Sequence, residues 1–204
     1  VSEAIVRAEK STSAEVVVTV VRQSGNYDHV APLVFAITFA LTMALGIEAH
    51  IYREWLPFSW SPQMALLVLL VGSVLLTFGI SRLRRVKRAL SSAEATERWV
   101  GLRAEVEFFE KVYGKTGAAS GVLIFVSLLE RRTMILADAP IFAKLPKESF
   151  DKTLAALNAR IADNALAEGL VEAVEAIAPL LAREFPIRPG DRNEISDQIV
   201  LKDD

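Results

Sequence analysis

The sequence VAPLVFAITFALTMALGI at Val30–Ile47 contains no charged residue, and a second such run, MALLVLLVGSVLLTFGI, follows at Met64–Ile80. Each run approaches the roughly 20 residues that a helix needs to cross the hydrocarbon core of a bilayer. Only Glu48–Gln63 separates them. We therefore interpret the pair as a transmembrane hairpin; the alternative is a pair of buried helices in a soluble core.

The residues that flank the two runs are of the types found at membrane surfaces. Aromatic side chains of the kind that settle at the headgroup level lie between the runs, and a cluster of cations follows the second run. Short segments rich in Lys and Arg stay on the cytoplasmic side, so we expect two passes with both termini cytoplasmic. The predicted membrane interface consists of Tyr52, Trp55, Trp60, Arg82, Arg84, Arg85, Lys87 and Arg88.

Charge and composition exclude several classes of function. The formal net charge is −2, which gives no general attraction to nucleic acid. A basic segment beside a membrane attracts anionic lipid headgroups instead. We therefore expect the lipid bilayer, and not nucleic acid, as a partner. The chain has no cysteine, which excludes disulfides, thiolate zinc sites and cysteine-based catalysis.

The residues outside the hairpin are numerous enough to form one domain with its own core. We assign residues 31–88 to the hairpin with its basic flank, and residues 1–30 and 89–186 to one discontinuous α/β domain. Residues 187–204 are polar and rich in turn-forming types, and we expect a C-terminal tail that is partly disordered.

Three stretches of this domain have the composition of buried strands. EVVVTVV at Glu15–Val21 and GVLIFVSLL at Gly121–Leu129 are apolar on both faces, which is typical of strands covered on both sides. The third stretch, TMILAD at Thr133–Asp138, follows after only Glu130–Arg132. The second and third strands therefore form an antiparallel hairpin.

Helical periodicity in the remaining segments completes the predicted fold. The large apolar residues of the longest predicted helix before the second strand step by three and four and form one stripe: Trp99, Leu102, Val106, Phe109 and Tyr113. A helix between the first two strands is the connection that parallel neighbours require. We predict an αβα sandwich with a mixed sheet and an inserted transmembrane hairpin. Its helices span Val1–Ser11, Ala93–Tyr113, Lys147–Asp163 and Ala165–Phe185, and Pro140–Pro146 is a loop.

Three segments together resemble the TPM-domain family. They are AEVVVTVV near the start, KVYGKTGAASGVLIFVSLLERRTMILAD in the middle and DRNEISDQIV near the end. They share with the family a strand that begins with glutamate, a GVLI-x-VS strand, an ER turn, a strand that ends in aspartate, and the ending of bacterial membrane-anchored members. The resemblance implies an αβ sandwich, roles in membrane-complex maintenance and receptor accessory function, and the phosphatase activity attributed to a plant thylakoid member.

The expected strand order brings two acidic residues to one edge of the sheet. If the first two strands are parallel, Glu15 lies beside Gly121, and the returning third strand brings Asp138 to the same edge. Such a pair could hold Ca²⁺ or Mg²⁺ or do acid/base work; alternatively, the carboxylates contact water or pair with Lys115. Glu15 and Asp138 match acids of the TPM motif. Glu9 matches another, although we expect it on a helix surface.

Two functions follow from these observations. The first is a bacterial inner-membrane accessory, assembly or regulatory factor that acts through contacts with a membrane protein or with its own copies. The second is a divalent-metal-assisted phosphatase, which depends on the family resemblance because the sequence offers no Ser–His arrangement and no Gly-rich nucleotide loop. The sequence assigns no catalytic residue, and whether the protein is an enzyme stays open.

Overall fold

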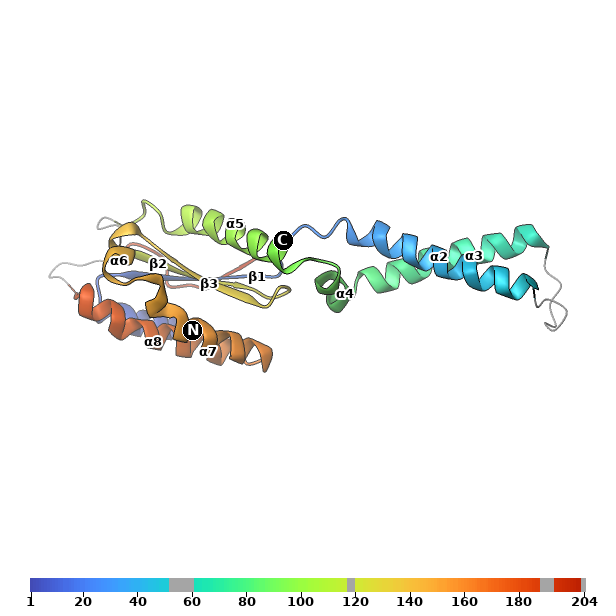
Figure 1. Cartoon of the computed structure of the whole chain (residues 1–204). Helices are drawn as coiled ribbons and strands as arrows, with labels where there is room; N and C mark the ends of the chain where they lie inside the picture. Colours follow the sequence, from blue (N-terminus) through green and yellow to red (C-terminus); the bar gives the residue numbers. More distant parts are fainter. Residues whose placement is uncertain (52–60, 117–119, 188–192, 203–204) are drawn as a thin grey trace. The chain divides into compact units, whose positions relative to one another are not determined.

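The computed structural model describes residues 1–51, 61–116, 120–187 and 193–202. Two compact units are present. Val1–Gly25 and Ala93–Asp204 form the first unit, a mixed α/β fold around a four-stranded sheet, and Asn26–Ser92 form the second, which contains the two apolar helices (Figure 1). Because the second unit is inserted between β1 and the rest of the first, the α/β unit is discontinuous in sequence.

The sheet has the order β3-β2-β1-β4. As the sequence predicts, β1 and β2 are parallel and β2 and β3 are antiparallel. All residues of β1 and β2 are buried, because helices cover both faces of the two central strands. The strands are β1 (Glu15–Val21), β2 (Gly121–Ser127), β3 (Arg132–Ala137) and β4 (Val200–Lys202).

One face of the sheet is covered by three helices, α1 (Ser2–Glu9), α7 (Asp151–Ala162) and α8 (Leu166–Glu184), as Figure 1 shows. Side chains alternate between the two faces of a strand, and those that point to this face include Val18 and Ile124. They form the larger part of the core together with apolar side chains of the helices.

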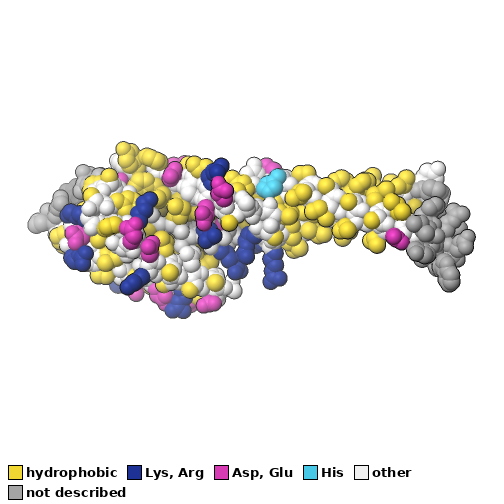
Figure 2. Space-filling model, in the orientation of Figure 1, with side chains coloured by type: hydrophobic (Ala, Val, Ile, Leu, Met, Phe, Trp, Pro, Cys, Tyr) yellow, Lys and Arg dark blue, Asp and Glu magenta, His cyan; other side chains and the backbone are white. Residues whose placement is uncertain are grey.

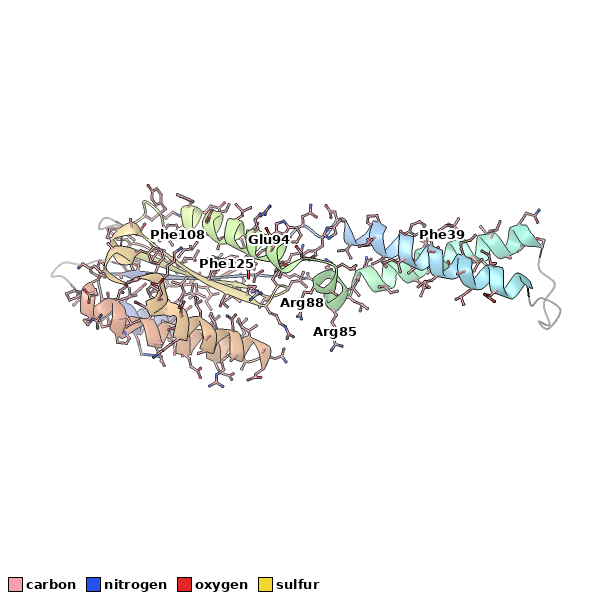
Figure 3. All side chains as sticks on the ribbon, in the orientation of Figure 1. Phe39, Arg85, Arg88, Glu94, Phe108 and Phe125 are labelled. Atoms are coloured by element: carbon pink, nitrogen blue, oxygen red, sulfur yellow. The ribbon has the colours of Figure 1, made fainter. Side chains whose placement is uncertain are left out.

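The other face is covered by α5 (Ala93–Lys111), whose Phe108 lies in one cluster with Phe125 of β2 (Figure 3). The buried side of α5 differs from its apolar stripe. It consists of Val100, Ala104, Glu107 and Phe108, whereas four members of the stripe are 49–61% exposed: Leu102, Val106, Phe109 and Tyr113.

A charged residue explains why hydrophobic periodicity misplaces the buried side of α5. Glu107 is fully buried and is paired with Lys202 at 2.7 Å and Arg103 at 3.2 Å. Burial of a carboxylate is tolerated where charged partners neutralise it. A pattern that counts only apolar residues assigns Glu107 to the solvent.

Three short elements also differ from the expectations. β4 lies in the predicted tail and pairs in parallel with β1, with Thr19 opposite Val200; three residues are too few to show a strand period. α6 (Ala139–Lys144) occupies the predicted loop, with a proline in its first turn, where the missing N–H breaks no helical hydrogen bond. The 3-10 helix η2 (Lys147–Phe150) precedes α7.

The second unit contains α2 (Val30–Ile51), α3 (Pro62–Ser81) and the short α4 (Arg84–Ala89). α2 and α3 pack closely: a Cβ at Gly46 would lie 2.5 Å from Leu69 Cδ1. Residues 30–48 and 63–81 are long and apolar enough to cross a membrane by length and composition. Tyr52, Trp55 and Trp60 lie outside the described residues.

Candidate functional site: a carboxyl pocket at the edge of the sheet

Glu15 and Asp138 lie at one edge of the sheet, as the strand order predicts. Glu15 begins β1 in register with Gly121 of β2, and the N–H of Gly121 donates to Asp138 Oδ2 at 2.9 Å. Both acids are buried, with 7% of Glu15 and 4% of Asp138 exposed. Their hydrogen-bond partners, however, give the two residues different surroundings.

Asp138 has a structural role at the end of the β2–β3 hairpin. In addition to the bond to its side chain, its own N–H donates to the carbonyl of Gly121 at 3.0 Å, and its carbonyl accepts from Ile141 at the start of α6. A Cβ at Gly121 would lie only 2.1 Å from Val112 Cγ1, so the close approach of these elements requires glycine. Asp138 is thus engaged in closing the hairpin.

Glu15 instead faces Glu9 and Asp197 across a pocket of about 240 Å³. Glu9 ends α1, Glu15 begins β1, and Asp197 belongs to the segment that leads into β4. The topology therefore assembles three acids from both ends of the chain. The pocket is lined by Val6, Glu9, Lys10, Thr12, Glu15, Ile187, Asn193 and Asp197.

Each of the two glutamates uses only one carboxylate oxygen for a hydrogen bond. Glu9 Oε1 accepts from the N–H of Val16 at 3.0 Å, and Glu15 Oε1 accepts from the N–H of Glu194 at 3.1 Å. The Oε2 atoms of both residues are buried and have no hydrogen-bond partner in the described part of the protein. Glu9 is therefore not the surface charge expected from the sequence, because its side chain turns toward the first residues of β1.

The electrostatics of the pocket favour protonated carboxyls. Burial raises the pKa of Glu9 from 4.5 to about 8, the Val16 N–H opposes this shift, and the charges of Glu15 and Asp197 add to it. Burial also raises the pKa of Glu15, against the N–H groups of Glu194 and Ile195. Near neutral pH the pocket therefore retains a proton unless a cation compensates its charge.

A divalent cation is chemically compatible with this pocket only in part. Ca²⁺ and Mg²⁺ prefer carboxylate oxygens, and the free Oε2 atoms of Glu9 and Glu15 are such ligands. Across the described ranges, however, no three His, Asp or Glu side chains are grouped so that they could hold a metal ion. A cation would thus bind through Glu9 and Glu15, with water as its other ligands, whereas Asp138 already binds Gly121.

Sequence reasoning missed Asp197 and Asn193 as parts of the pocket. The amide of Asn193 donates to Asp197 Oδ1, which orients this acid. Both residues lie in the segment NEISD, which the sequence distinguishes only by its resemblance to a family ending. That motif was the one available signal, because the contact between Glu194 and Glu15 joins residues 179 positions apart.

The predicted basic interface forms a second group of functional candidates. Arg82, Arg84, Arg85 and Arg88 are exposed, at the end of α3 and on α4. The guanidinium of Arg82 lies 3.9 Å from the centre of the Phe78 ring, and the ammonium group of Lys87 lies 5.4 Å from the Tyr27 ring. A cation held against an aromatic face in this way is attracted by the negative face of the ring.

Comparison with known proteins shows a similar fold. No family model matches the sequence, and no curated protein matches it. The NMR structure of the BA42 protein from the psychrophilic bacterium Bizionia argentinensis is similar, with a TM-score of 0.56 and 18% sequence identity, and the match covers 98% of this chain and 88% of that chain. At this identity the similarity supports the fold alone, and membership of the TPM-domain family stays a prediction.

Proposed function

We propose that α2 and α3 form a transmembrane hairpin that anchors the α/β unit at the cytoplasmic face of a bacterial inner membrane. There the unit acts as an accessory factor of a membrane complex through protein contacts. The resemblance to the TPM-domain family supports this role, as does the basic segment after α3. The observation that carries the proposal is the exposure of the two apolar helices.

Apolar side chains cover the visible surface of α2 and α3 (Figure 2), and sixteen large ones in the described part of these helices are 37–68% exposed. At roughly 1 kcal/mol for each half-exposed side chain, keeping them in water costs on the order of 15 kcal/mol relative to burial. This is as much as the whole stability of a typical domain. Only 17% and 6% of the residues in the two candidate spans are buried, which does not fit core helices of a soluble protein.

The interior of the hairpin supports the same proposal. Thr38 Oγ1 lies 3.0 Å from Thr77 Oγ1, and Thr77 Oγ1 donates to the carbonyl of Ser73 at 2.8 Å. Ser73 is fully buried between the helices. Hydroxyl groups turned inward and apolar groups turned outward are the arrangement expected of helices that pack in lipid.

The test uses single cysteines, since the chain contains none. The first variant is Ser59→Cys, between the two spans in the sequence, and the second is Lys152→Cys, at an exposed position of α7. In intact spheroplasts an impermeant maleimide should label the first variant, and should label the second only after lysis. Labelling of Lys152→Cys in intact spheroplasts, or release of the chain by alkaline carbonate, would overturn the proposed topology.

Co-purification in mild detergent tests whether the protein has a partner. Recovery of no stoichiometric partner would contradict the accessory role.

A second candidate, cation-dependent phosphatase chemistry, is favoured by the unpartnered carboxylate oxygens of Glu9 and Glu15. Calorimetric titration of the detergent-purified chain with Ca²⁺ or Mg²⁺ tests the binding step, and phosphate-ester turnover with and without the cation tests the reaction. Glu15→Gln should abolish both signals, whereas Asp138→Asn should preserve cation binding. Binding that survives Glu15→Gln would remove the pocket from this function.

A further inference from the structure

A groove runs between α2 and α3 at the end that leads into α4. It has a volume of about 350 Å³, and its walls include Pro32 and Phe35 from α2 and Val74 and Phe78 from α3. This volume is in the range of clefts that hold small ligands. Ser81, the last residue of α3, lies at one end of the groove.

The groove is shorter than the hydrocarbon thickness of one lipid leaflet. Ser81 lies seven positions after Val74, and at about 1.5 Å per residue the groove extends roughly 10 Å along α3. One leaflet contributes about half of a hydrocarbon core roughly 30 Å thick. If α3 crosses the membrane as proposed, the groove begins at the headgroup boundary and opens onto the acyl chains of the cytoplasmic leaflet.

Cations follow the polar end of this groove in the chain. Arg82 follows Ser81 directly and its guanidinium lies over Phe78, which is itself a wall of the groove. Arg84, Arg85 and Arg88 are exposed on the next helical turn and a half, and Figure 3 shows Arg85 extending away from α4. Within the part of the chain that the structure describes, no carboxylate forms an ion pair with these four arginines.

We propose that this groove binds one anionic phospholipid of the cytoplasmic leaflet. An acyl chain lies against Phe35, Val74 and Phe78, and the phosphate contacts the guanidinium of Arg82. Arginine suits this role because its planar donors match phosphate oxygens. Free phosphate would contact the cations but make no contact with the apolar walls, and a zwitterionic lipid would fill the groove without net charge complementarity. The inference rests on the proposed membrane hairpin and gives it a lipid specificity.

The experiment measures lipid retention by native mass spectrometry of the full chain, purified in neutral detergent and exposed to phosphatidylglycerol or phosphatidylcholine with identical acyl chains. One phosphatidylglycerol per chain should be retained, with roughly tenfold preference over phosphatidylcholine. Inorganic phosphate in large excess should not displace it. Equal retention of the two lipids, or displacement by phosphate, would overturn the proposal.

Variants separate the headgroup contact from the acyl-chain contact. Arg82→Gln should lower phosphatidylglycerol retention by roughly tenfold and leave phosphatidylcholine unchanged, whereas Arg82→Lys should retain part of the preference. Arg98→Gln, which removes another exposed arginine charge, from α5, is the control and should have no effect. If Arg98→Gln lowered phosphatidylglycerol retention as much as Arg82→Gln, the preference would be a general effect of charge and the Arg82 contact would be wrong.

Filling the groove is the complementary test. Val74→Trp should reduce retention of both lipids, and Leu75→Trp, on the neighbouring exposed position, should not. Equal retention by the two tryptophan variants would contradict the groove as the binding site. If cysteine labelling contradicts the proposed topology, the transmembrane hairpin itself is wrong. If the topology is correct but the chain shows no lipid preference, only the lipid-binding inference is wrong.

Discussion

The strands and the two long helices are made of the same kinds of residues, yet their burial is opposite. In β1 and β2 the valines, leucine and isoleucine are at most 3% exposed, whereas in α3 Leu75 is 67% exposed. Both segments lack interior charges. The contrast shows that apolar composition alone does not predict whether a segment is buried within the protein. In the hairpin that we propose, lipid would cover the apolar side chains that the protein leaves exposed.

The largest expected difference comes from placing the same charge in each region. Ile124→Asp puts an ionisable group at a position with 0% exposure and should cost more than about 4 kcal/mol, so the α/β unit should lose its protease resistance. Leu75→Asp should instead weaken membrane insertion by roughly 3 kcal/mol, seen as increased carbonate extraction, while the α/β unit stays resistant. Ile124→Val is the conservative control. If the Leu75→Asp variant instead became more soluble without detergent, the expectation that α3 inserts into a membrane would be contradicted.

A smaller effect is expected where the first unit leads into the second. Glu130 is buried and accepts hydrogen bonds from the N–H groups of Ser24 and Gly25, each at 3.0 Å, and from the hydroxyl of Ser127. Glu130→Ala leaves these donors unsatisfied and should reduce the free energy of unfolding by about 3 kcal/mol. Urea unfolding of the full chain in detergent, monitored by circular dichroism, measures this free energy. Glu148→Ala, at an exposed position, is the control. An unchanged midpoint would show that these hydrogen bonds do not stabilise the α/β unit.

The carboxyl pocket predicts a pH dependence that the hairpin should lack. The pKa of Glu9 is raised from 4.5 to about 8 in the folded chain, so the folded state binds more protons than the unfolded state between these values. The contribution of protonated Glu9 to stability should therefore be fully present below about pH 4.5 and be lost as the pH rises through about 8. Thermal unfolding across this interval tests the sign. Glu9→Gln should flatten the curve and Glu3→Gln, on the exposed face of α1, should not; a curve that rises with pH would contradict the assignment.

The smallest effect is expected inside the hairpin. Thr38→Val removes the contact with Thr77 but leaves the helices packed, and should cost about 0.6 kcal/mol in a membrane environment. Thr42→Val is the matched control, because its hydroxyl donates to the carbonyl of Phe39 within the same helix. Unfolding by steric trapping in bicelles would resolve the pair. A loss above about 2 kcal/mol would mean that the hydroxyl cluster organises the hairpin.

The fold was predictable where a pattern is long and uniform. EVVVTVV and GVLIFVS are apolar on both faces, and their order with TMILAD determines the parallel and antiparallel pairings that the structure confirms. The buried side of α5 was not predictable, because Glu107 is neutralised by Lys202 from the far end of the chain. β4 was missed for the same reason: its pairing depends on a contact with β1 rather than on its own three residues.

The candidate site was predictable only as far as strand order extends. Topology placed Glu15 and Asp138 at one sheet edge, but it could not show that the Asp138 side chain accepts from Gly121. Nor could it place Glu9, whose orientation depends on how α1 packs and on the hydrogen bond to Val16. Residues that meet through tertiary packing leave no local signal in a single sequence.

The position of β1 in the chain has a consequence for synthesis on the ribosome. β1 is complete at Val21, but its first neighbour in the sheet begins at Gly121 and its second at Val200. At about 5–20 residues per second, translation leaves this valine-rich strand without a neighbour for roughly 5–20 s. An unpaired strand of this composition readily joins other nascent chains. The apolar helices emerge from the ribosome during this interval. If the insertion machinery captured them early, it would keep the unpaired β1 strand away from the β1 strands of other nascent chains.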